Sequence, residues 1–197
     1  MNLKYIKPNI FTFITSYIVF ILIFSVISYK VLVTDLIKLE EIQNKNNINT
    51  ILNSMNTNII NITNITNDYS QWDDTYEFIN NSNKEYIYEN FREGIDTLKD
   101  LDIDFFIFSN KKQKVLFSKY IDNNLKKDKQ SFEKKILRKF KKDKVVNTII
   151  KFNTSYLYLV KSEILKSDGS GDINGWIYSG RIIKNKELIG MSESFDT

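Results

Sequence analysis

The sequence predicts an α+β protein in which one transmembrane helix leads into a long helix that packs on an antiparallel sheet of about five strands. Residues 10–29 contain no charged side chain, which indicates a membrane helix. The chain has neither proline nor glycine from Thr34 to Asp68, so nothing interrupts a helix there. Short apolar runs separated by turn residues follow, which is typical of strands.

Composition excludes several classes of function. A chain of 197 residues suits one domain with a real core. The net charge of +4 is small, and lysine greatly outnumbers arginine, so we expect no nucleic-acid partner. The chain has no cysteine and no histidine, which removes disulfides, thiolate metal sites and the usual general base. We therefore predict no enzyme, no catalytic residue, no cofactor and no metal site.

The apolar run Ile10–Tyr29 matches the roughly 30 Å hydrocarbon core of a bilayer when helical. Lys4 and Lys7 precede it and favour an internal N-terminus. A cleaved signal peptide is the alternative, but its apolar region is usually about 7–15 residues long and ends in small residues, which this run lacks. We expect an uncleaved anchor.

Three segments follow from this anchor. We expect residues 1–9 in the cytoplasm, residues 10–33 in the cytoplasmic (inner) membrane in contact with membrane lipid, and residues 34–197 outside the cytoplasm. No second hydrophobic run follows in this sequence, so we expect the sensor domain to be truncated before a second transmembrane helix.

The helix beyond the anchor carries a heptad-like apolar stripe. Its spacing alternates between four and three residues, and charges beside it are sparse. Such a stripe needs a packing partner, either the domain of the same chain or a second subunit, and we expect a long helix that feeds one domain. The stripe comprises Ile48, Leu52, Met55, Ile59, Ile62, Thr66 and Tyr69.

An aromatic and acidic stretch, residues 67–91, follows the stripe. If residues 67–79 form a helix, Tyr69, Trp72 and Tyr76 share one face, and Asp73 lies beside Glu77 on a neighbouring face. The aromatic face is either core with solvated edges or the wall of a site for a cationic ligand.

Strand patterns occupy most of the remaining chain. Residues 103–108 and 114–120 predict a hairpin, and residues 145–152, 156–165 and 175–183 predict three further strands. The hairpin connections are too short for parallel crossovers, so the sheet is antiparallel.

A lysine-rich segment lies between these strands. Residues 126–144 form an amphipathic helix with an apolar stripe of Phe132, Ile136, Leu137 and Phe140. Its basic face is either solvated or attracted to anionic lipid headgroups. This order of elements is that of a PAS-like sensor sheet.

Two separated motifs resemble a known family. Residues 67–76, with Tyr86, Asn90 and Phe91, resemble the opening motif of the CHASE extracellular sensory domain, fourth type. Residues 162–171 and 175–181 resemble its closing hairpin, and residues 98–108 and 113–117 fit its central hairpin. The resemblance covers roughly residues 38–194 and implies a Cache/PAS-like domain outside the membrane in bacterial receptors. The cytoplasmic parts of such receptors are histidine kinases, diguanylate cyclases or phosphodiesterases. The resemblance also implies a homodimer, to which the heptad-like stripe adds little support.

Two functions agree with these observations. In the first, a small-molecule ligand binds between the sheet and its covering loops, and the membrane helix passes the signal on. Its pocket would be lined by Trp72, Asp73, Tyr76, Tyr86 and Arg92, whose carboxylate and rings favour a cationic ligand. In the second, the domain has no ligand and serves dimerisation or partner docking.

A structural ion pair is also expected. We predict that Arg181 pairs with Asp73 or Asp74 and so ties the closing strand to the aromatic and acidic stretch.

Overall fold

A computed structural model describes residues 9–92, 96–142, 146–185 and 187. The described residues divide into two compact units, one up to Thr50 and the other from Ile51 onward. Helix α1 (Ile10–Ser70) contributes to both units, which confirms the expectation of an uninterrupted helix beyond the anchor.

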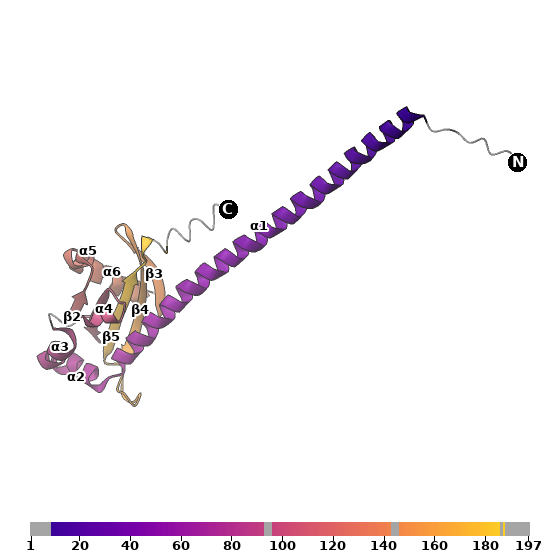
Figure 1. The fold of residues 1–197 in the computed structure, drawn as a ribbon. Coiled ribbons are helices and arrows are strands. Elements are labelled where there is room, and N and C mark those ends of the chain that lie inside the picture. The colour runs from indigo at the N-terminus through magenta and orange to yellow at the C-terminus, as the bar shows by residue number, and fades with distance from the viewer. Residues whose placement is uncertain (1–8, 93–95, 143–145, 186, 188–197) are drawn as a thin grey trace. The chain divides into compact units, whose positions relative to one another are not determined.

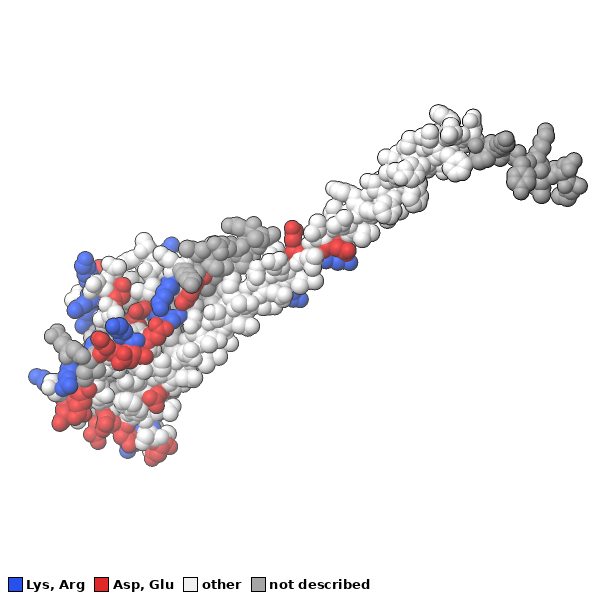
Figure 2. Space-filling view, in the orientation of Figure 1, with Lys and Arg blue, Asp and Glu red and all other residues white. Residues whose placement is uncertain are grey.

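The first unit consists of the apolar part of α1. Its large hydrophobic side chains are exposed, from Ile10 at 77% to Leu32 at 62%, and they make the white stretch of surface at the N-terminal end of α1 in Figure 2. Within the described part of the chain, α1 alone is long and apolar enough to cross a membrane. An exposed apolar circumference is the surface that lipid would cover.

The second unit is built on one antiparallel sheet of five strands, in the order β2-β1-β5-β4-β3 (Figure 1). The expected fold class is thereby confirmed. The central pairing joins β1 to β5, with Phe105 opposite Gly180 and Ile107 opposite Tyr178. The strands are β1 (Phe105–Asn110), β2 (Val115–Tyr120), β3 (Asn147–Phe152), β4 (Ser155–Ile164) and β5 (Gly175–Ile182).

Helices cover both faces of this sheet. The end of α1 packs on one face together with α2 (Asp73–Asn81), α3 (Lys84–Phe91) and α4 (Thr97–Asp100). On the other face lie α5 (Asn123–Lys127) and α6 (Lys129–Lys142). The alternation of side chains along β1 sorts Phe106 and Phe108 to the first face and Phe105 and Ile107 to the second.

The amphipathic pattern of α6 is confirmed. Phe132 and Ile136 are fully buried and Phe140 is nearly so, while Leu137 is partly buried at the edge of the same cluster. Lysines occupy the opposite side of the helix, as expected for a solvated face.

One predicted helix is wrong. Residues 67–79 do not form a continuous helix, because α1 ends at Ser70 and α2 begins at Asp73. The backbone of Trp72 is extended, with φ −87° and ψ 136°. The carbonyl of Ser70 accepts a hydrogen bond from the Leu165 N–H (3.1 Å) beyond the end of β4 and so is satisfied without a further helical turn.

Candidate functional site

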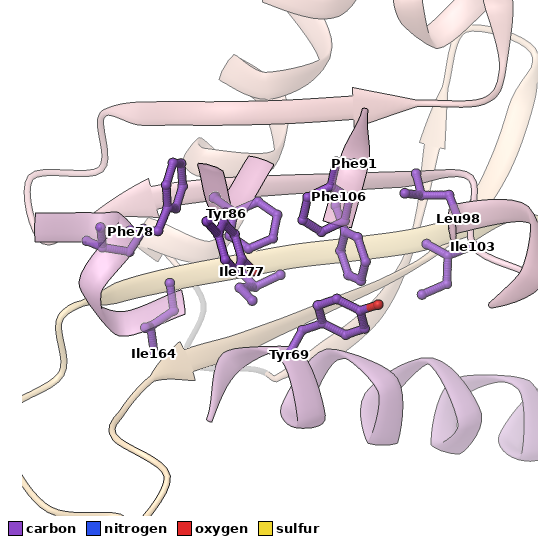
Figure 3. Packing of buried hydrophobic residues seen from close by; sticks show 11 residues of the cluster. Tyr69, Phe78, Tyr86, Phe91, Leu98, Ile103, Phe106, Ile164 and Ile177 are labelled. Carbon is purple, nitrogen blue, oxygen red and sulfur yellow. The ribbon is translucent and has the colours of Figure 1, made fainter. Parts of the chain in front are cut away.

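The aromatic stretch forms the core between the helices and the first face of the sheet (Figure 3). The Tyr69 ring of α1 lies 5.2 Å from that of Phe106 and 6.0 Å from that of Phe91. Phe78 and Tyr86 stack with centroids 5.1 Å apart. The interpretation of this stretch as core is therefore confirmed for Tyr69, Phe78, Tyr86 and Phe91, all of them buried.

Polar groups cross this otherwise apolar contact between α1 and the sheet. The hydroxyl of Thr66 bonds to that of Ser179 on β5, and the hydroxyl of Ser70 bonds to that of Ser162 on β4 (2.8 Å). Ser162 also donates to the Asn67 side chain (2.7 Å). We call Thr66, Ser70, Ser162 and Ser179 the hydroxyl seam. Because buried hydroxyls need partners, the seam fixes the position of α1 on the sheet.

The predicted partner of Arg181 is wrong. Arg181 is 7% exposed, and its guanidinium donates from Nη1 to Asp102 and from Nη2 to Glu187 (3.0 Å). Both oxygens of Asp73 are instead used by Ser167, through its N–H (3.0 Å) and its hydroxyl (2.8 Å). Because β1 lies beside β5, the loop before β1 brings Asp102 to the end of β5, where Arg181 is.

Arg181 borders a cavity on the same side of the sheet, which we call the Arg181 cavity. It has a volume of about 300 Å³. Polar side chains of α1 form one wall, and Leu101 with Asp102 from the α4–β1 loop forms another. The α1 wall comprises Asn58, Asn61 and Asn64 with Ile62 and Ile65.

A third carboxylate, that of Asp104, lies beside the cluster of Arg181, Asp102 and Glu187. Asp104 accepts a hydrogen bond from the Ile182 N–H (2.7 Å) through its side chain. Burial raises the pKa of Asp104 above its usual value, against the opposing effects of that hydrogen bond and of Arg181.

The predicted ligand-binding residues lie at several places. Trp72 stacks on Tyr69 with centroids 4.4 Å apart, and Tyr76 is partly buried against the same cluster, with Lys166 Nζ 5.9 Å from its ring centroid. The buried Tyr86 hydroxyl bonds to Thr75 (2.7 Å), and burial raises the pKa of this phenol. These rings are held as parts of the core.

The two charged members of that set have local partners. The hydrogen bonds from Ser167 lower the pKa of Asp73. The Arg92 guanidinium lies 4.9 Å from the Tyr88 ring centroid. Both side chains are exposed, as is that of Asp74.

Asp74 belongs to an acidic depression on α2 and α3, over which Asp and Glu side chains gather in Figure 2. Its volume is about 170 Å³, and it is lined by Asp74, Glu77, Asn83, Glu85, Tyr86 and Glu89. In the described ranges, no group of three or more His, Cys, Asp or Glu side chains is arranged so that it could hold a metal ion.

A sequence model of the CHASE4 domain matches residues 54–196. The chain belongs to the CHASE4 domain family. This confirms the resemblance of the aromatic and closing motifs to that family. CHASE4 is a sensory domain, so the matched region is the extracellular sensing domain of a receptor and is not itself a catalytic domain. Together with the apolar part of α1, it makes the chain a membrane protein with an extracellular domain.

Other comparisons add little. No curated protein matches the sequence. Among solved structures, a crystal structure of the periplasmic domain of Vibrio cholerae LuxQ is 10% identical, with a TM-score of 0.49 over 79% of this chain and 71% of that chain. The selenomethionine form of the same periplasmic domain is 13% identical, with a TM-score of 0.49 over 79% and 70% of the two chains.

Sequence reasoning missed Asp102 and the three asparagines of the cavity wall. Asn58, Asn61 and Asn64 recur every three residues, so they share one side of α1. That spacing is the signal that could have identified them. It was obscured because asparagine is abundant throughout the second half of α1, from Asn44 to Asn67.

Proposed function

We propose that this CHASE4 domain is the ligand-sensing domain of a bacterial receptor in the cytoplasmic membrane, and that α1 carries the signal. The observation that supports this most directly is that α1 belongs both to the apolar unit and to the core of the sensory unit. A helix held in this core responds to any ligand that changes its preferred position on the sheet.

The hydroxyl seam suits such a response. Thr66 and Ser70 are bonded to partners on two different strands, and Ile62 packs on Tyr158 and Val160 nearby. A few directional bonds define discrete positions of a helix more sharply than apolar contacts alone do. A ligand shifts α1 only if it binds one of these positions more tightly than the other.

Spin labels can test the movement because the chain has no cysteine of its own. In the full chain in lipid nanodiscs, labels at Ser54→Cys on α1 and Lys111→Cys in the β1–β2 turn would report the distance between helix and sheet. We expect a ligand found by thermal-shift screening to change that distance. As a control, the distance between labels at Lys111→Cys in the β1–β2 turn and Lys134→Cys on α6 should not change. A bound ligand that leaves both distances unchanged would contradict signalling through α1.

The alternative function is an interaction module without its own ligand. The heptad-like stripe gives this alternative little support, because Met55, Ile59 and Ile62 pack on the sheet of the same chain. A specific feature that supports docking is a groove between α6 and β2 of about 430 Å³, lined by Lys134, Arg138 and Lys141 over Val115 and Leu137. Sedimentation of the full chain in detergent, with and without Arg138→Glu, tests homodimerisation or an acidic partner at this groove.

The receptor's output is a separate proposal. We infer that the signal reaches an enzymatic module of the complete receptor, such as a histidine kinase or a diguanylate cyclase. The family supports this inference through the receptors in which such sensory domains occur.

A further inference from the structure

Arg181, which lines the Arg181 cavity, has a buried donor without a partner among the described residues. The side chain of Arg181 is 9% exposed, and Nη1 and Nη2 are bonded to Asp102 and Glu187. The third guanidinium nitrogen, Nε, is buried, and its N–H has no hydrogen-bond partner among the residues that the structure describes. A buried N–H without a partner is unfavourable, so an acceptor atom that reached it would be bound with a net gain.

The two charged residues that line the cavity, Arg181 and Asp102, form an ion pair with each other. Arg181 also pairs with Glu187, and Lys184 Nζ lies 3.7 Å from the second oxygen of Asp102. A charged ligand would be repelled by the lining residue of like charge, and the described lining of the cavity has no excess of the opposite charge to compensate. The cavity therefore favours a molecule with no net charge.

The remaining wall offers carboxamides. Asn58, Asn61 and Asn64 each provide donors and an acceptor, and Leu101 and Ile65 supply apolar surface beside them. A volume of about 300 Å³ is roughly that of ten water molecules in the liquid. Small polar molecules of about ten non-hydrogen atoms fit these dimensions and this chemistry.

We propose that the Arg181 cavity binds a small polar molecule with no net charge, neutral or zwitterionic. An oxygen of the ligand accepts a hydrogen bond from the Nε–H of Arg181, and a donor group of the ligand faces Asp102. This inference rests on the proposed sensory function and specifies where the ligand binds. The site differs from the aromatic pocket expected around Trp72.

Asp102 lies at the exposed end of the site. Its side chain is 64% exposed, and its backbone has a positive φ of 51°, which is uncommon outside glycine although aspartate adopts it more often than most residues. A small movement of this residue would open the end of the cavity to Arg181. A ligand between Asp102 and Asn61 then contacts α1 and the loop before β1 together, which gives it different affinities for different positions of α1.

Ligand-observed NMR with the full chain in nanodiscs tests the proposal. The probes are three sets of molecules of at most about ten non-hydrogen atoms: net-neutral ones, including L-serine, acetamide and ribose, then anionic and cationic ones. We expect saturable binding from the net-neutral set and a loss of at least tenfold in affinity in Asn61→Leu. The matched control is Asn56→Leu, which changes an exposed asparagine of the same helix outside the cavity.

Arg181→Lys provides a second variant, which keeps the charge but lacks the guanidinium. We expect it to lose binding as well, provided its circular dichroism matches the unmodified chain; Asn61→Leu decides the matter if it does not. Binding only of charged probes, no binding in any set, or equal binding by the Asn61→Leu and Asn56→Leu variants would overturn the proposal. A ligand that binds here without changing the α1–sheet label distance would contradict the proposed function and leave this site standing.

Discussion

The two faces of the sheet are built differently. The face under α5 and α6 is filled mainly by apolar and aromatic side chains, and the Phe132 ring lies 4.9 Å from that of Phe105 and 4.8 Å from that of Phe152. Polar bonds to α6 occur at the outer strand β2, where Ser118 and Tyr120 donate to Glu133. The face under α1 combines the aromatic core with the hydroxyl seam, the buried Arg181 and the Arg181 cavity. Both faces belong to the same compact unit.

The difference indicates that the two faces of the sheet have different roles. A densely packed apolar face gains stability from burial and has one preferred arrangement. The core under α1 is also apolar and aromatic, but the directional polar contacts beside it can be exchanged one at a time. We therefore assign ligand response to the α1 face and a purely stabilising role to the α5–α6 face.

The largest effect is expected on the apolar face. Phe132→Ala removes a fully buried ring between three aromatic neighbours and should lower the free energy of unfolding by about 3–5 kcal/mol. Chemical denaturation measures the loss, and Lys134→Ala on the exposed side of α6 is the matched control. A loss below about 1 kcal/mol would show that this face is not the stabilising one.

A smaller loss is expected at the polar cluster on the α1 face. Arg181→Met should cost about 1.5–3 kcal/mol because it removes hydrogen bonds to Asp102 and Glu187. The exposed Lys184→Met should cost under about 1 kcal/mol. In double-mutant cycles, Arg181 should couple to Asp102 and be additive with Asp73. Coupling to Asp73 instead would restore the pair expected from the sequence.

The hydroxyl seam should contribute about 1 kcal/mol per pair. Thr66→Val keeps the shape of the side chain but leaves Ser179 without its bond to α1. Adding Ser179→Ala should cost little more than Thr66→Val alone, since the second hydroxyl is then already unpaired. Thermal unfolding of the two single variants and the double variant measures this coupling, and simple additivity would argue against a seam.

The smallest effect concerns pH. Because the folded-state pKa of Asp104 is raised above 3.8, the folded chain binds more protons than the unfolded chain between the two values. The contribution of Asp104 to stability therefore falls as pH rises through that window, and its ionised form is unfavourable at neutral pH. Asp104→Asn keeps an acceptor for Ile182 and should slightly raise the melting temperature at pH 7, whereas the exposed Asp100→Asn should not. A lower melting temperature in Asp104→Asn would show that its charge is stabilising.

Local patterns were sufficient to predict most of the elements. Short apolar runs between turn residues predicted β1 to β5 within a few residues, and the spacing of Phe132, Ile136 and Phe140 predicted the buried side of α6. The helix break at Trp72 could not be predicted, because it depends on the Leu165 N–H, which the fold brings to Ser70 from another strand. Local sequence does not contain that contact.

The candidate site depends even more on topology. Arg181 and Asp102 are 79 positions apart and meet because β1 and β5 are neighbours in the sheet. Asp73 and Asp74 form the denser acidic cluster in the sequence, but the fold brings Asp102 to Arg181 instead. The cavity likewise requires α1, the α4–β1 loop and β5 to converge.

Hydrogen–deuterium exchange of the full chain, with and without a net-neutral ligand, tests the division between the two faces most directly. We predict slower exchange in residues 58–70 of α1 and around Arg181, with no change in α6. Slower exchange confined to α6 would contradict the assignment of ligand response to the α1 face, as would equal slowing on both faces.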